Sequence, residues 1–80
     1  MKHRTGYKGY VIEVQASELR DGGFSAEFYI EEHDSSGVTV TQFYVPSTFP
    51  TQEAAIESAV RAGRQKIDEG FEPRSAVASR

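Results

Sequence analysis

The feature that most constrains the fold is a helical repeat that begins after Phe49-Pro50-Thr51 and ends at Gly70. Within it, apolar residues recur at every third or fourth position, which places them on one stripe of an α-helix. Thr51 suits the N-cap and Gly70 the position after the helix. The many small residues predict close packing on an apolar sheet. The stripe comprises Ala55, Ile56, Ala59, Val60, Gly63 and Ile67.

The segments before this helix alternate in polarity with the period of two that half-buried strands show. We predict strands over residues 7–16 and 24–31, joined by a turn at Asp21-Gly22-Gly23, whose residues tolerate positive φ. The polar run His33-Asp34-Ser35-Ser36-Gly37 predicts a second hairpin loop. The side chains expected to face the helix are Tyr10, Ile12, Val14, Ala16, Phe24, Ala26, Phe28 and Ile30.

A third strand is predicted over residues 38–46, but its alternation is ambiguous because both of its faces carry large apolar side chains. We expect Val40 and Tyr44 to face the helix, and Phe43 and Val45 to lie partly outward. A bulge within the strand would change this register midway.

These elements predict an α+β fold, a three-stranded antiparallel β-meander packed on one C-terminal α-helix (β-β-β-α). A chain of 80 residues makes one domain and buries only about 60–65% of its unfolded surface. We assign residues 1–6 to a flexible N-terminal segment, 7–70 to the domain and 71–80 to a disordered C-terminal tail.

The composition indicates the cellular compartment and the class of partner to expect. The chain has no Cys, so neither a disulfide nor a thiolate metal site is available, and the cytoplasm is our default expectation. No window approaches the ~18 apolar residues of a membrane span. The net charge is −3, with nine acidic residues and one basic residue between positions 13 and 57. This excess of acidic residues argues against nucleic acid as the main partner, since phosphate binding depends on Lys and Arg.

One local group resembles a catalytic or metal site, namely His33 and Asp34 beside Glu31 and Glu32. Metal ligands must converge from well-ordered elements, whereas these neighbours on a strand end and loop point in different directions. Ser35 and Ser36 lack the oriented base and oxyanion pocket that a nucleophile requires. We therefore expect no enzymatic activity, no catalytic residue, no metal and no cofactor.

A protein-interaction module is the function that the pattern favours, because one helix leaves the other sheet face to solvent. The segment 38–45 has high strand propensity and no charge, so at a sheet edge it would pair with a partner strand or with its own copy. The partner is then another protein or a second copy in a homodimer. The candidate contact residues are Tyr29, Thr41, Phe43 and Val45.

The alternative is a nucleic-acid-binding accessory domain that uses basic residues near both ends of the chain. Sheet readers of DNA and RNA combine such residues with exposed aromatic rings. Glu13 and Glu27, expected on the same open face, count against this alternative. Its candidate contacts are Lys2, Arg4, Lys8, Arg61, Arg64 and Lys66.

Between residues 7 and 70 the chain resembles small uncharacterised proteins of beta-proteobacteria. The resemblance concerns strand starts, the first hairpin and the helix cap, and it implies no activity. It is carried by Tyr7-Lys8-Gly9-Tyr10, Leu19-Arg20-Asp21-Gly22-Gly23-Phe24, Phe49-Pro50-Thr51 and Gly63-Arg64-Gln65-Lys66-Ile67-Asp68.

Two shorter segments, Asp21-Gly22-Gly23-Phe24 and Thr51-Gln52-Glu53-Ala54-Ala55, are similar to HicB-type antitoxins. In that family an Asp-Gly-Gly-aromatic run opens a strand and a Thr-x-Glu-Glu-Ala run opens a helix. The middle of this chain lacks the family's Pro-x-x-x-Gly-Cys segment.

Overall fold

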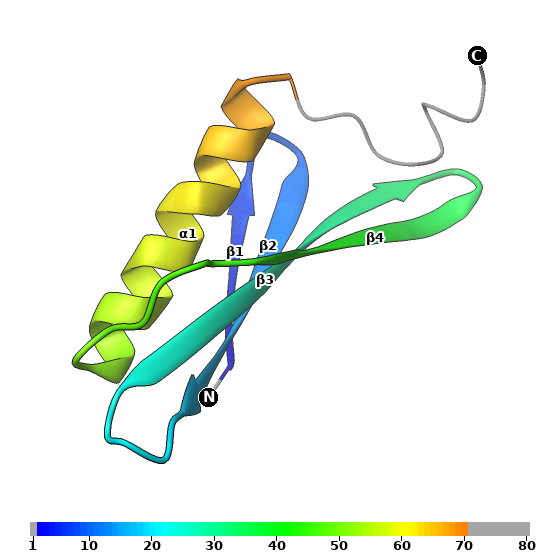
Figure 1. Ribbon diagram of the computed structural model, residues 1–80. Helices are drawn as coiled ribbons and strands as arrows, with labels where there is room; N and C mark the ends of the chain where they lie inside the picture. Colours follow the sequence, from blue (N-terminus) through cyan, green and yellow to red (C-terminus); the bar gives the residue numbers. More distant parts are fainter. Residues whose placement is uncertain (1, 71–80) are drawn as a thin grey trace.

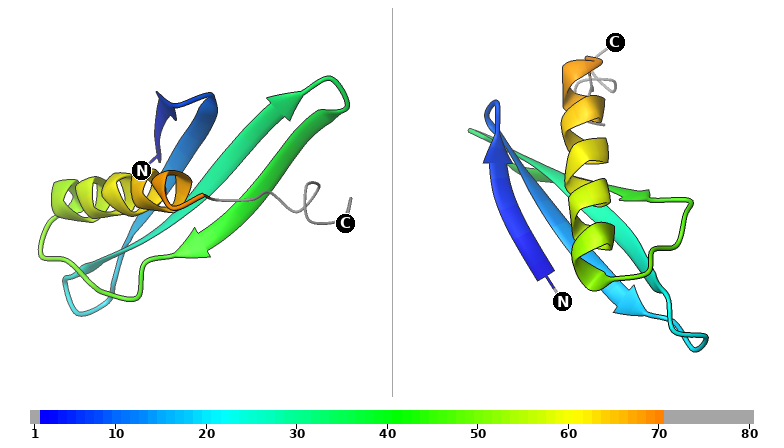
Figure 2. Two further views of the ribbon diagram at one scale, coloured as in Figure 1. Left: turned by 90° about the horizontal axis from the view of Figure 1, so that it is seen from above. Right: turned by 90° about the vertical axis from the view of Figure 1, so that its left-hand side faces the viewer.

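The computed structural model describes residues 2–70, which form four antiparallel strands followed by one helix (Figure 1). The strands are neighbours in chain order within one sheet, and the helix lies across one face of the two central strands (Figures 1 and 2). The elements are β1 (Lys2–Tyr7), β2 (Tyr10–Glu18), β3 (Phe24–Asp34), β4 (Gly37–Tyr44) and α1 (Gln52–Asp68).

The prediction of three strands was wrong, because residues 2–6, which we assigned to a flexible N-terminal segment, belong to a fourth strand, β1. Its residues pair antiparallel with β2, from Lys2 opposite Gln15 to Tyr7 opposite Tyr10. Lys8 and Gly9 make the connecting turn with φ of 51° and 87°, the left-handed pair that tight hairpins require. The predicted C-terminal tail, 71–80, lies outside the described residues.

Both predicted hairpin turns are confirmed. At the first, the Leu19 N–H donates to the Gly23 carbonyl at 2.7 Å, and Gly22 takes a φ of 97°. At the second, Asp34 Oδ1 accepts from the Ser36 N–H at 2.9 Å and from the Ser36 hydroxyl at 2.8 Å. The Asp34 side chain thus stabilises the loop by accepting hydrogen bonds in the way that a backbone carbonyl does in a turn.

The expected register of β4 was also wrong. Phe43 lies opposite Phe28 on the helix side of the sheet, and the two rings stack with centroids 5.1 Å apart. Val40 and Tyr44 therefore project from the opposite face, where they are 53% and 71% exposed. Val45, which we also expected to lie partly outward, packs against the buried core.

The predicted helix and its N-cap are confirmed. Thr51 Oγ1 accepts a hydrogen bond from the Ala54 N–H at 3.1 Å, which satisfies one of the unpaired donors of the first turn. The helix ends at Asp68, and Gly70 adopts a φ of 92° just beyond it. The helix residues that become buried are Ala55, Ala59, Gly63 and Ile67, while Ile56 and Val60 lie at its flank.

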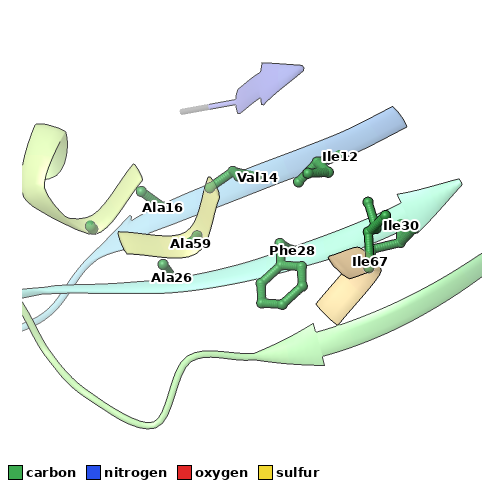
Figure 3. Packing of buried hydrophobic residues seen from close by; sticks show 9 residues of the cluster. Ile12, Val14, Ala16, Ala26, Phe28, Ile30, Ala59 and Ile67 are labelled. Atoms are coloured by element: carbon green, nitrogen blue, oxygen red, sulfur yellow. The ribbon is translucent and has the colours of Figure 1, made fainter. Parts of the chain in front are cut away.

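The core is a thin layer between α1 and the two central strands. Its largest fully buried side chains are Phe28, Ile12, Ile30 and Val14, and Figure 3 shows the small helix residue Ala59 among the strand residues. At Gly63 the helix lies so close to the sheet that an added Cβ would be 3.0 Å from Ile12 Cγ2. This contact distance sets how near the helix can lie to β2.

We predict that Gly63→Ala lowers the free energy of unfolding by about 1 kcal/mol, because crowding a packed core costs about 1–3 kcal/mol. Alanine should otherwise stabilise a helix by about 1 kcal/mol relative to glycine. Urea denaturation of the variant, with exposed Glu57→Ala as the control, measures the difference. An equal or higher stability of Gly63→Ala would show that moving Ile12 aside costs no more than the ~1 kcal/mol that alanine contributes to the helix.

Candidate protein-interaction surface

The outer edge of β4 is one of two sheet edges on which the described chain leaves backbone groups without a strand partner. Within residues 2–70, β4 pairs with β3 alone. The Val45 N–H donates to the Ala26 carbonyl at 3.1 Å, and hydrogen-bonded pairs alternate along an antiparallel ladder. The N–H and C=O groups that point away from β3 are therefore those of Val38, Val40, Gln42 and Tyr44, and we call these four residues the β4 edge.

The β4 edge lacks the features that usually protect an exposed strand. Protected edges carry charged side chains, proline or bulges that stop another strand from pairing. Segment 38–45 contains neither a charge nor a proline, and the pairing of β3 with β4 runs without a break in register. The opposite edge strand, β1, carries Lys2, His3 and Arg4. Of the two sheet edges, β4 is thus the one without charged side chains.

The β4 edge also stands clear of the rest of the domain. The hairpin of β3 and β4 runs well past the C-terminal end of α1 (Figure 2, left), and the molecule is elongated, 44 × 20 × 20 Å. Val38 and Val40 on this hairpin are 55% and 53% exposed. An incoming chain can therefore reach the backbone of β4 without displacing the helix.

The sheet face opposite α1, here called the open face, carries an ion-pair network centred on Arg4. Arg4 Nη1 lies 2.7 Å from Glu13 Oε1 and 2.9 Å from Glu31 Oε2, which links β1, β2 and β3. Hydrogen bonding by Arg4 lowers the pKa of Glu31 below its ordinary value. The same hydrogen bond raises the pKa of Arg4. The network ties the charged edge strand to the centre of the sheet.

A second polar cluster lies on the open face beside β4. Gln42 Nε2 donates to Glu27 Oε2 at 2.7 Å, and the Tyr29 hydroxyl donates to the same oxygen. This hydrogen bond to Glu27 is the main reason that the pKa of Tyr29 is raised. The cluster directs the Gln42 side chain toward β3.

The structure separates the candidate contact residues that the sequence indicated. Tyr29 lies on the open face, whereas Thr41 and Phe43 lie on the helix side of β4, opposite Ile30 and Phe28. The Phe43 ring is engaged by Phe28 and by Lys66, whose Nζ is 5.4 Å from its centroid.

Sequence reasoning missed Val38, Val40 and Tyr44, which are the exposed large apolar residues of this strand. A two-residue loop between Asp34 and Gly37 puts Phe43 opposite Phe28, so counting outward from that loop would have found them.

The side chains that we considered as a catalytic or metal site, at the loop between β3 and β4, bind to one another and to neighbouring residues. His33 Nε2 lies 3.2 Å from Glu31 Oε1, and that carboxylate is also bound by Arg4. Hydrogen bonds from Ser36 lower the pKa of Asp34. Across residues 2–70, no three His, Asp or Glu side chains converge as metal ligands would.

The six basic residues of the nucleic-acid alternative are dispersed. Arg4 is paired with acids on the open face, and Lys8 Nζ lies 2.7 Å from Asp68 Oδ1 near the end of α1. Arg61 and Arg64 border a hollow of about 520 Å³ whose other lining residues include His3, Ile56 and Val60. These cations form several small groups with different surroundings.

We predict that the Arg4–Glu31 pair makes stability depend on pH. Because the pKa of Glu31 is lower in the folded state, its contribution is present above its ordinary value of 4.5 and is lost as the pH falls through the folded value. Glu31→Gln should melt at a lower temperature than wild type at neutral pH, and the gap should narrow below pH 4.5. Thermal melts over a pH series, with exposed Glu57→Gln as the control, measure this. A gap that stays constant into acid contradicts the assignment.

No helix within residues 2–70 is long and apolar enough to cross a membrane. Comparisons with curated proteins and with solved structures found no match, so the similarity to HicB-type antitoxins stays a prediction. A family profile does match residues 1–79, nearly the whole sequence, and on this ground the chain belongs to the DUF6566 family, a domain of unknown function.

Proposed function

We propose that this protein is a non-enzymatic protein-interaction module that binds by accepting an extended strand at the β4 edge. The observation that carries the proposal is the combination of four outward-facing N–H and four outward-facing C=O groups with an uncharged strand. Strand addition of this kind derives its affinity from main-chain hydrogen bonds and its specificity from alternate side chains.

The side chains beside the β4 edge support this mode of binding. Val38, Val40 and Tyr44 are exposed on the open face, where the alternate side chains of an added strand would cover them. Each main-chain hydrogen bond contributes about 0.5–1.5 kcal/mol net, and part of this is lost to ordering the partner. We therefore expect binding of moderate strength that depends on the backbone of β4.

The contrast between the two sheet edges supports the choice of β4 over β1. At β1, the Tyr7 hydroxyl donates to both carboxylate oxygens of Asp68 at 2.9 Å, and the Arg64 guanidinium lies 5.5 Å from the Tyr7 ring centroid. These contacts attach β1 to the helix. With Lys2 and Arg4 exposed along it, this edge would repel a second basic strand and disfavour an apolar one.

We do not adopt nucleic-acid binding as the function. Affinity for phosphate requires several cations that can act together on one backbone. Here Arg4 and Lys8 already pair with carboxylates, and Lys66 lies over an aromatic ring. The acids Glu13, Glu27 and Glu31 occupy the open face on which exposed bases would stack.

The proposal is tested by Val40→Pro, with Val40→Thr as the matched control. The Val40 N–H points away from β3, so proline removes an edge donor without breaking the ladder, as edge prolines generally do. Threonine keeps the donor and the strand propensity. Circular dichroism should show both variants folded, and Val40→Pro should bind its partner about tenfold more weakly or worse.

Binding is measured in two ways, by sedimentation of the purified protein and by affinity capture from cell extract. Association or capture that is equally strong for wild type and Val40→Pro, with the variant folded, would refute strand addition at β4. Loss in Val40→Thr as well as in Val40→Pro would assign the binding to the side chain instead of the backbone.

A further inference from the structure

We infer that the strand accepted by β4 is the β4 of a second copy. The two strands pair antiparallel about a two-fold axis that passes between the two Thr41 residues. This inference rests on the proposed function and names its partner. It follows from the spacing of the β4 edge, from its charge and from the position of α1.

The spacing of the β4 edge permits one complete symmetric register. In an antiparallel two-fold pair, the numbers of opposing residues have a constant sum, and residues that point to the shared edge must face each other. All four residues of the β4 edge are used when Val38 faces the Tyr44 of its copy and Val40 faces the Gln42 of its copy. A shift by two residues in either direction leaves one of them unpaired. In the complete register, Thr41 faces the Thr41 of the second copy.

The side chains brought together by this register are compatible. On the open face, a β-branched residue, Val38, meets an aromatic one, Tyr44, which is a favourable cross-strand combination. Both side chains are more than half exposed in the single chain, so pairing removes apolar surface from water. An exposed, uncharged strand that matches its own copy is the self-complementary surface that a two-fold interface requires.

The charges nearest the axis do not oppose the pairing. Segment 38–45 is uncharged, and the closest acids, Glu27 and Glu31, lie on β3 opposite Tyr44 and Val40. In the pair of copies, two such acids are separated by three strand spacings, about 14 Å. This exceeds the Debye length of about 8 Å at physiological ionic strength, so their repulsion is screened.

The helix leaves room for the second copy. α1 packs on β2 and β3, so a strand added beyond β4 does not meet it. A two-fold axis normal to the sheet places both helices on the same face, with β4 and its copy between them. The result is a continuous eight-stranded antiparallel sheet in which the unprotected edges are buried and the charged β1 strands form both outer edges.

A single cysteine tests the register directly, because the chain has none of its own. Thr41 belongs to a pair without hydrogen bonds across the axis, where Cα atoms lie about 4.5 Å apart, within the range of about 4.4–6.8 Å that a disulfide spans. Thr41→Cys should therefore form a covalent dimer under mild oxidation. Thr39→Cys is the matched control, since it lies on the same face and would be about 14 Å from its copy.

We expect Thr41→Cys to cross-link at least about tenfold faster than Thr39→Cys, a ratio that corresponds to about 1.4 kcal/mol. Combining Thr41→Cys with Val40→Pro should abolish the difference. Equal rates for the two cysteine variants would overturn the symmetric pairing about Thr41. Faster linkage of Thr39→Cys would overturn this register in favour of a symmetric pair centred on Thr39.

Sedimentation of the protein without cysteine distinguishes failure of this inference from failure of the proposed function. A dimer that dissociates on dilution and is lost in Val40→Pro supports both. A monomer at every concentration, together with Val40-dependent capture of a different chain, overturns the second copy as partner and leaves strand addition standing. A dimer that forms equally well in Val40→Pro overturns both the inference and the proposed function.

Discussion

The constraint on which the structure depends is the close approach of one narrow helix to the middle of a four-stranded sheet. Ala55, Ala59 and Gly63 bring the helix backbone near β2 and β3, where Ile12 and Phe28 fill the space beneath it. A helix is about 10–12 Å wide with its side chains, whereas neighbouring strands are about 4.8 Å apart. One helix therefore covers about two strands, and neither edge strand contributes a fully buried residue to the core.

The two edge strands differ in the contacts that their side chains make with the rest of the fold. β1 carries charged residues, is tied across the open face by Arg4 to Glu13 and Glu31, and is attached to the helix through Tyr7 and Asp68. β4 has the stack of Phe43 on Phe28 at one end, while its distal half extends past the helix without a charge. Among residues 2–70 the ion pairs join β1 to its neighbours or lie at the ends of other elements, and none involves β4. This difference between the edges supports the proposed role of β4 in binding.

Much of the fold could be predicted because its signals are local. The cap at Thr51, the glycine turn before β3 and the small-residue stripe of α1 each depend on residues within a few positions of one another. β1 escaped prediction because its residues are polar or glycine, and its stability comes from pairing with β2 instead of from burial. The register of β4 failed because both of its faces carry apolar side chains, so periodicity could not choose between them.

The sequence by itself determined the helix, its caps, the two hairpin turns that flank β3 and the inward face of the two central strands, since backbone conformation and short-range hydrogen bonds specify these features. It also determined that residues 38–45 are uncharged and prone to form a strand. Only the tertiary structure decided that this strand lies at an edge, that Val38, Val40 and Tyr44 face outward, and that Tyr29 and Phe43 lie on opposite faces. Those outcomes depend on which strands pair and on how much of the sheet one helix can cover, and both are properties of contacts between residues far apart in the chain.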